Sequence, residues 1–289
     1  MNEEIKTIKY NDEKYPGILK RYELMPEILY CIGDLPDPDK KSVAIVGARG
    51  CSDYGRGEAT RFATSLAAAG IQVISGMALG VDSAAHEGAL KAGGRTFAVF
   101  GCGVDLCYPV SKGRLYERII KNGGIISEYE PGTPALPHHF PVRNRIISGL
   151  SDAVLVIEAR RRSGSLITAN YAIEQGKTVY ALPGRIRDSL SEGTNDLICQ
   201  GAIPAVSPEQ IIRDFGLNDE TSTVDTALVE RNLSDDEKRL LKCITSDPKT
   251  LEMLYKESRM PLVQVGSLLM RLQIDELVKE TGPGWYVRK

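Results

Sequence analysis

Short apolar segments alternate with helical segments six times after residue 41, and this alternation constrains the fold more than any other feature of the chain. The pattern is typical of a doubly wound α/β sheet with helices on both faces. The apolar segments are rich in Val, Ile and Ala, as strands buried on both faces are. The predicted strands are residues 42–47, 71–76, 95–101, 124–129, 152–159 and 177–184. The predicted helices are residues 57–69, 82–92, 112–121, 143–150, 166–175, 194–200 and 208–215.

A second, smaller hydrophobic unit follows this domain. Residues 216–230 are polar, acidic and without periodicity, which indicates a linker. Ser234 and Glu237 form a capping-box pattern at the start of a helix. Two further helical segments and a Gly-Pro-Gly hairpin then complete the pattern of a winged helix. The expected domains are an N-terminal extension packing on the core (1–41), the α/β domain (42–215), the linker (216–230) and the winged helix (231–289).

The charge of the winged helix favours contact with protein over reading of duplex DNA. Residues 233–289 hold ten basic and nine acidic side chains, and Arg271 is the one basic residue on the third helix. Reading of a duplex groove normally needs several basic contacts to phosphate. We therefore expect this domain to contact another protein.

Composition and charge set the general class of protein. The 289 residues are 42% hydrophobic and 26% charged with a net charge of −2, which is ordinary for a soluble globular protein. The charged N-terminal segment and the lack of an apolar run of roughly 20 residues predict a cytoplasmic protein without a membrane span. The six cysteines show no CxxC pairing, and His138 and His139 lack a nearby third ligand. We therefore expect free thiols, no metal and no cofactor.

The segment from Phe140 to Arg162 concentrates positive charge. It contains five arginines, at positions 143, 145, 160, 161 and 162, against two acidic residues. The last three follow a predicted buried strand, and the Ser163-Gly164-Ser165 sequence after them opens a helix whose free N–H groups can bind anions. The local excess of arginine predicts a phosphate grip with a polyanion as its partner.

Three candidate anion sites follow strands of the predicted sheet. They are the turn at residues 47–49, the helix start at 163–165 and a later helix start at 193–195. The alternative for each is a simple helix cap or turn. Phe140 is either a stacking surface for an unpaired base or a core aromatic, and the sequence leaves both open.

Several enzyme classes lack their motifs. The turn after the first strand has neither the G-x-G-x-x-G spacing nor the following acid of a NAD site. Gly176-Lys177-Thr178 precedes a strand and has Tyr171 where a P-loop needs its first glycine. No G-x-S-x-G elbow or HExxH helix is present. The chain is therefore expected to bind its ligand without catalysis.

Long stretches of the chain resemble the DprA/Smf family of DNA-processing proteins. The matching motifs are GARGCSDYG (47–55), SGMALGVDSAAHEGAL (75–90), PHHFPVRNRIISGLSD (137–152) and SGSLITANYAIEQGK (163–177), with a weaker match at 15–33. Residues 233–289 are similar to the winged-helix tail that many members carry. The resemblance implies an extended Rossmann-like, mostly parallel sheet in a homodimer that binds and protects incoming single-stranded DNA and helps to load RecA in natural transformation.

The resemblance also implies which residues contact DNA. Some family members have a lysine at the position of Pro137, and many begin with a helical domain that this sequence does not show. The expected DNA-binding residues are Gly47, Ala48, Arg49, Gly80, His139, Phe140, Arg143, Asn144, Arg145, Arg160, Ser163, Gly164, Ser165 and Thr168. Two alternatives stay open. One is a binding protein or LOG-like phosphoribohydrolase for a nucleotide-derived small molecule, although the Pro131–Pro134 loop lacks that motif's glutamate. The other is a scaffold for RecA that does not bind DNA.

Overall fold

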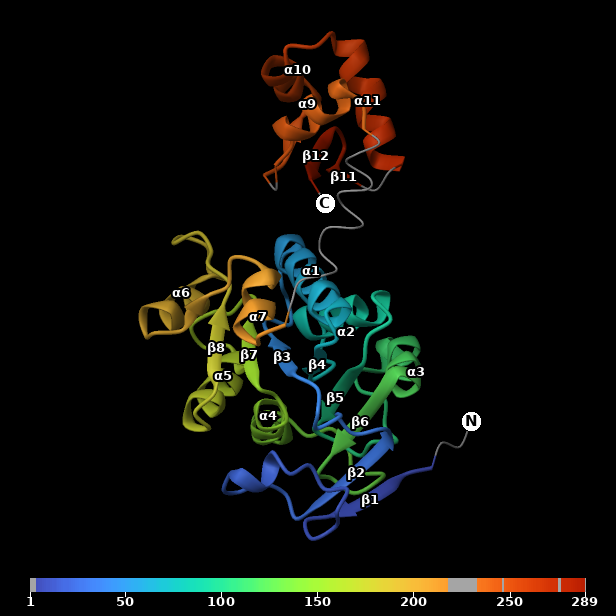
Figure 1. The fold of residues 1–289 in the computed structure, drawn as a ribbon, viewed down its shortest axis with the longest axis vertical. Helices are drawn as coiled ribbons and strands as arrows, with labels where there is room; N and C mark the ends of the chain where they lie inside the picture. The colour runs from blue at the N-terminus through green and yellow to red at the C-terminus, as the bar shows by residue number, and fades with distance from the viewer. Residues whose placement is uncertain (1–3, 218–232, 246, 275–276, 289) are drawn as a thin grey trace. The chain divides into compact units, whose positions relative to one another are not determined.

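The computed structural model describes residues 4–217, 233–245, 247–274 and 277–288 (Figure 1). The chain divides into two compact units, Met1–Asp219 and Glu220–Lys289, which are described separately below. Most of the predicted linker, residues 216–230, lies outside the described residues.

The first unit is built on one nine-stranded sheet. Its strand order is β1-β2-β6-β5-β4-β3-β7-β8-β9, and every pairing from β6 to β9 is parallel. The order runs outward from β3 in both directions, as in a doubly wound fold, so the prediction of an extended Rossmann-like sheet is confirmed. The strands are β1 (Lys6–Lys9), β2 (Ile28–Gly33), β3 (Ser42–Val46), β4 (Gln72–Ser75), β5 (Thr96–Phe100), β6 (Gly123–Ser127), β7 (Ala153–Val156), β8 (Thr178–Ala181) and β9 (Ile203–Pro204).

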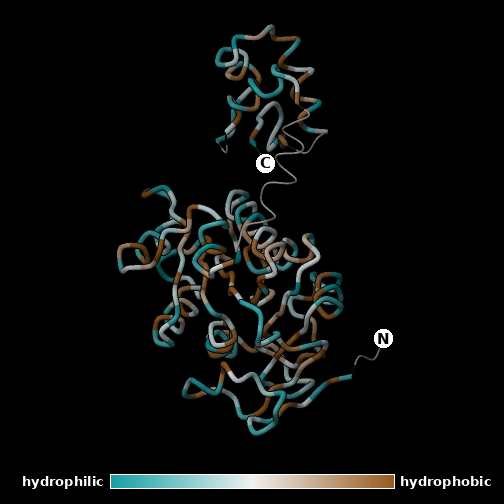
Figure 2. Tube along the Cα trace, viewed as in Figure 1, coloured by the Kyte–Doolittle hydropathy of each residue, from teal (hydrophilic) through white to brown (hydrophobic). Residues whose placement is uncertain are grey.

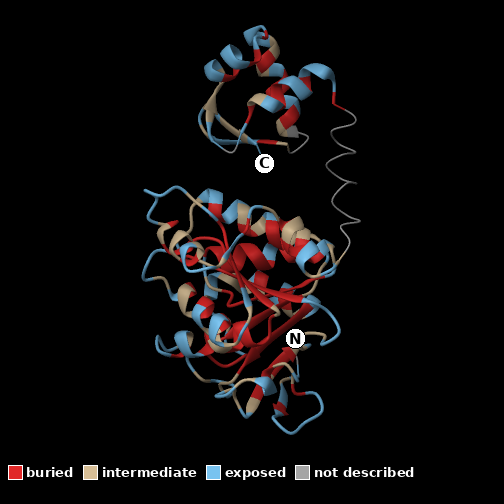
Figure 3. Ribbon diagram, turned by 60° about the vertical axis from the view of Figure 1, so that its left-hand side comes forward, coloured by how far each residue is buried: buried red, intermediate tan, exposed pale blue. Residues whose placement is uncertain are grey.

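Helices cover both faces of this sheet because alternate strand residues are apolar on both sides. In β3, Val43 and Ile45 pack against α1, α2 and α7, whereas Ala44 and Val46 pack against the side formed by α4, α5 and α6. Figure 2 shows hydrophobic stretches along the central strands, and Figure 3 shows these strands as buried. The helices are α1 (Asp53–Ala68), α2 (Val81–Lys91), α3 (Gly113–Asn122), α4 (His139–Gly149), α5 (Gly164–Glu174), α6 (Glu192–Cys199) and α7 (Pro208–Asp214), with short 3-10 turns at η1 (Leu19–Arg21) and η2 (Val110–Lys112).

Helix α4 starts four residues earlier than the predicted start at residue 143. It begins at His139, so Phe140 lies in its first turn. Pro141 is compatible with this earlier start, because a proline in the first turn of a helix gives up no intrahelical hydrogen bond. Phe140 and Arg143 therefore share one rigid element.

The N-terminal extension is part of the same sheet. Strand β2 pairs antiparallel with β6, and β1 pairs antiparallel with β2. Tyr15 and Leu29 are buried against the core. The residues before β3 thus widen the sheet by two strands, which the sequence pattern did not predict.

In its described residues, the second unit has three helices and a small antiparallel sheet, the arrangement expected of a winged helix. The capping box is present, since Ser234 Oγ accepts from Glu237 N and the Glu237 carboxylate accepts from Ser234 N at 2.8 Å. The elements are α9 (Asp235–Cys243), β10 (Lys249–Thr250), α10 (Leu251–Ser258), α11 (Leu262–Ile274), β11 (Val278–Gly282) and β12 (Trp285–Arg288), with sheet order β10-β12-β11. In the part of the chain that the structure describes, no helix is long and apolar enough to cross a membrane.

Candidate functional site

A pocket of about 530 Å³ lies at the carboxyl ends of β3 and β7, where the strand order diverges. This is the position at which open α/β sheets bind ligands. Its charged lining consists of four arginines and one acid: Arg49, Arg143, Arg160, Arg162 and Asp82. The pocket is therefore strongly biased toward anions.

Helix α4 supplies one wall of the pocket. Phe140, Arg143, Asn144 and Ile147 all line it. Their spacing of i, i+3, i+4 and i+7 places them on one face of a helix. The FxxRN part of the predicted motif thus presents a single surface to the ligand.

The turn after β3 supplies a second wall. Ala48 N donates to Glu158 O at 2.7 Å, and Val81 N donates to Ala48 O at 3.3 Å. Gly47 is needed for this packing, because a Cβ there would lie 2.7 Å from Val81 Cγ2. Gly80 has a φ of +82°, and a Cβ there would clash with the Ala48 carbonyl oxygen. Gly80 itself does not line the pocket. Because it has no Cβ, the start of α2 can pack closely against the turn that carries Arg49.

Arg143 is a buried charge at the base of the pocket, only 4% exposed. Its Nη1 donates to Gly76 O at 3.0 Å and also to Val99 O. Burial lowers the pKa of Arg143 to about 10, and nearby Asp82 opposes this shift. Arg143 therefore stays charged at neutral pH and is fixed in place before any ligand arrives.

Asp82 is the acid beside Arg143, and the sequence analysis did not select it. It lies in the first turn of α2 and is 6% exposed. Burial raises its pKa to about 6, while Arg143 and hydrogen bonds from Ala78 and Gly76 N–H groups lower it. An acid within the small-residue helix at 81–91 was the available signal, because a carboxylate on a buried helix face needs a partner.

Helix α5 begins at the rim of the pocket. Ser163 is its N-cap and accepts from Ser165 N at 3.4 Å, and the two hydroxyls lie 2.8 Å apart. Asn144 Nδ2 donates to Gly164 O at 3.1 Å, which ties α4 to this helix start. Thr168, one turn later, also lines the pocket. The free N–H groups and positive dipole end of α5 add to the positive field.

The carboxylate of Glu158 does not line the pocket, because it accepts hydrogen bonds from Ser52. It is 3% exposed and accepts from Ser52 N at 2.8 Å and from Ser52 Oγ at 2.5 Å. Its carboxylate fills the space beside Gly55 in the first turn of α1. Glu158 thus compensates the dipole of α1.

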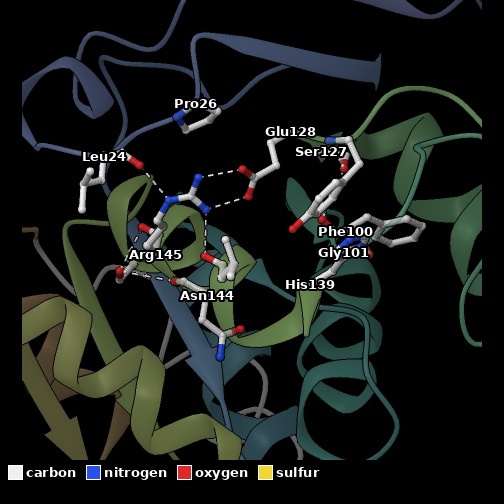
Figure 4. Close-up of polar contacts among 12 residues, drawn as sticks. Leu24, Pro26, Phe100, Gly101, Ser127, Glu128, His139, Asn144 and Arg145 are labelled. Atoms are coloured by element: carbon white, nitrogen blue, oxygen red, sulfur yellow. Dashed lines mark hydrogen bonds and ion pairs between the residues drawn. The ribbon is translucent and has the colours of Figure 1, made fainter. Parts of the chain in front are cut away.

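Arg145, an expected DNA contact, does not line the pocket. Both of its Nη atoms lie 2.6 Å from the Glu128 carboxylate, and its Nε donates to Leu24 O at 2.8 Å (Figure 4). Residues two apart on a helix project in nearly opposite directions, which separates Arg145 from Arg143. Arg161 is also turned away and pairs with Asp196 at 3.3 Å.

His139 likewise does not line the pocket. Its ring stacks on Tyr129, with ring centroids 3.9 Å apart. Its Nδ1 lies 3.1 Å from Gly101 O (Figure 4). Its position secures the first turn of α4. Within the described ranges, no three His, Cys, Asp or Glu side chains are grouped to hold a metal.

The helix start at residues 193–195 is not part of the pocket either. Gly193 N donates to Ala159 O at 2.7 Å, and the Asn195 amide bonds both backbone groups of Gly184. These contacts pack α6 against the loops after β7 and β8. The predicted third anion site is therefore a structural junction.

A doubly wound sheet with an arginine-lined pocket at its switch point defines an α/β protein whose pocket is suited to an anionic, phosphate-like ligand. The family described as DNA recombination-mediator protein A matches residues 6–216. The chain belongs to this family, the DprA/Smf proteins.

Individual relatives agree with this assignment. Protein Smf of Escherichia coli is 36% identical to this chain. The aligned region spans 97% of this chain and 76% of that protein. DNA processing protein DprA of Streptococcus pneumoniae is 42% identical over 71% of this chain and 72% of its own. A structure of DNA processing protein A from Helicobacter pylori, described for its single-stranded DNA binding mode, is 32% identical with a TM-score of 0.66, covering 74% of this chain and 96% of that one.

Proposed function

We propose that this protein binds single-stranded DNA through the arginine-lined pocket and mediates recombination by binding, without catalysis. The observation that carries the proposal is the pairing of the fixed charge of Arg143 with the exposed Arg49, Arg160 and Arg162 in one recess. Charge-assisted bonds from arginine suit phosphate, and several arginines suit several phosphates. The relative from Helicobacter pylori described above supports DNA as the source of these phosphates.

The recess favours a single strand over a duplex. Arg143 lies at the base of the pocket, so a phosphate must enter to reach it. A flexible strand can turn one phosphate inward, whereas a duplex with a persistence length of about 50 nm presents its phosphates on a stiff rod. Binding of single strands is therefore expected to be much tighter.

Titration of labelled oligonucleotides, single-stranded and duplex, at several salt concentrations tests the proposal. For a single strand, the logarithm of affinity should fall linearly with log salt, by about 0.7 for each phosphate neutralised. Equal affinity for single strand and duplex would contradict the selectivity. Salt-independent binding would contradict the phosphate grip and favour the small-molecule alternative. The site does not support the phosphoribohydrolase alternative, because the Pro131–Pro134 loop does not line the pocket.

Loading of RecA and formation of a homodimer are further parts of the proposal, and both rest on family resemblance. RecA loading is tested by the rate of RecA assembly on an oligonucleotide with and without this protein. Sedimentation tests the dimer. A protein that binds DNA as a monomer and leaves RecA assembly unchanged would restrict the function to protection of the strand.

A further inference from the structure

Phe140 is the sequence-based candidate for stacking on an unpaired base; its ring lines the pocket, is only partly exposed and is contacted on several sides. The Arg49 guanidinium lies 5.4 Å from the ring centroid and that of Arg143 lies 5.8 Å from it. Gly101 packs against the ring edge, where an added Cβ would lie 3.1 Å from Phe140 Cδ1. Tyr108 covers a further part of the ring, with centroids 5.3 Å apart and planes 33° apart.

Tyr108 is therefore the outer ring of a short stack that starts at the arginine pocket. It is 42% exposed, and on the same loop Leu106 and Val110 are 38% and 84% exposed. The two distances to Phe140 place the Tyr108 ring within about 11 Å of the Arg49 guanidinium. Phosphates of one strand advance about 3.4 Å in a duplex and more when the strand is extended, so this span suits one to three nucleotides.

The loop that carries Tyr108 is held in place by three hydrogen bonds. Gly103 N donates to Thr133 O at 2.9 Å, and Gly132 N donates to Asp105 Oδ1 at 2.9 Å. Tyr116 Oη donates to Val104 O at 2.7 Å. A pre-positioned ring loses little conformational freedom when a base stacks on it.

We propose that Tyr108 is a base-stacking residue of this site, on which the unpaired base next to the gripped phosphate lies. The proposal rests on the single-strand binding proposed above. Stacking of a base on an aromatic ring does not depend on base identity, because every base has a π-face. The bases of a duplex are paired and stacked on one another, so they cannot use this ring. Tyr108 thus contributes to the preference for single strands.

The test compares Tyr108→Ala and Tyr108→Phe in the full chain, with oligothymidylate and an abasic oligonucleotide of equal length as probes. Tyr108→Ala should bind oligothymidylate about 5- to 100-fold more weakly, and Tyr108→Phe should stay within about twofold. On the abasic probe, which keeps the phosphates and lacks bases, Tyr108→Ala should equal the parent. Tyr255→Ala is the matched control, because Tyr255 is also 42% exposed but lies on α10 of the other unit.

Four results would overturn the proposal. Parent-like binding of oligothymidylate by Tyr108→Ala would remove Tyr108 from the site. An equal loss on both probes would show that it only supports the arginine pocket. Photocrosslinking with 5-iodouracil oligonucleotides should give an adduct at Tyr108, and adducts at Phe140 alone would assign the stacking to that ring. Failure of the parent protein to bind either probe would contradict single-strand binding itself, and the stacking with it.

Discussion

Arg145 and Glu128 form a two-pronged ion pair in which each Nη atom lies 2.6 Å from a carboxylate oxygen. The pair joins α4 to the segment after β6, and the bond from Arg145 to Leu24 O adds the N-terminal extension. Both side chains are largely buried, at 13% and 15% exposure. Arg145 therefore positions the helix that carries Phe140 and Arg143, and the family motif contains both a ligand-facing and a structural arginine.

Glu128→Gln should lower the stability of the protein and weaken DNA binding. Loss of a charge-assisted bond of this kind costs about 1.5–3 kcal/mol, measurable by denaturant unfolding. The direction of the affinity change separates two roles for Arg145. If Arg145 contacted phosphate, removal of the competing carboxylate would strengthen DNA binding, and that outcome would contradict the positioning role.

Arg49→Ala should weaken single-strand binding with little effect on stability. Arg49 is exposed at the pocket rim, so its loss removes a phosphate contact worth about 1.5–3 kcal/mol and leaves the core intact. Fluorescence anisotropy gives the affinity, and thermal unfolding serves as the control. An unchanged affinity in the folded variant would exclude Arg49 from the grip.

Gly76→Ala should impair binding through Arg143. A Cβ at residue 76 would lie 2.5 Å from Arg143 Nη1, so the guanidinium must move from its position at the base of the pocket. Gly57→Ala is the matched control, because a Cβ there meets no atom within 4 Å. Equal affinities of the two variants would show that the position of Arg143 is not important for binding.

DNA binding should strengthen as pH falls from 7 to 5, because protonation of Asp82 removes the negative charge beside Arg143. Its pKa of about 6 in the folded protein is above its ordinary value of 3.8. The folded state therefore holds a proton between pH 4 and 6 that the unfolded state lacks, so the stability contribution of Asp82 is largest at low pH and is lost as pH rises through 6. Arg143 stays charged across this range. His86 also stays uncharged, because burial lowers its pKa to about 3.

Asp82→Asn isolates this effect from other titrating groups. The variant should bind DNA at pH 7 with an affinity closer to that of the parent at pH 5, and its pH dependence should be flatter. Affinities of the two proteins at pH 5, 6 and 7 give the comparison. Parallel pH profiles would assign the dependence to other groups.

Removal of the second unit from about residue 232 should leave a folded core that binds single strands. The two units have separate hydrophobic cores, and the charge of residues 233–289 is close to neutral, so few counterions are released there. A loss of affinity greater than about tenfold, or about 1.4 kcal/mol, in a truncated protein whose oligomeric state by sedimentation matches that of the full chain would show that this unit binds DNA directly.

The sequence alone determined the features that depend on neighbouring residues. Alternating apolar segments predicted six strands of the sheet, and the spacing of Ser234 and Glu237 predicted a capped helix that the structure contains. The Ser163-Gly164-Ser165 sequence predicted a helix start for the same reason, because a cap is a local arrangement of side chain and backbone. Parallel strands also end at one edge, so the position of the pocket followed from the order of the segments.

Only the tertiary structure decided which charged and aromatic groups line the pocket. Arg143 and Arg145 are two residues apart, yet one reaches the pocket and the other pairs with Glu128. Phe140 lies in α4 and Tyr108 lies in the loop after β5, and the two rings contact each other only because these segments pack together. Such contacts join segments far apart in the chain. They depend on how helices and loops pack over the sheet, which local sequence patterns do not specify.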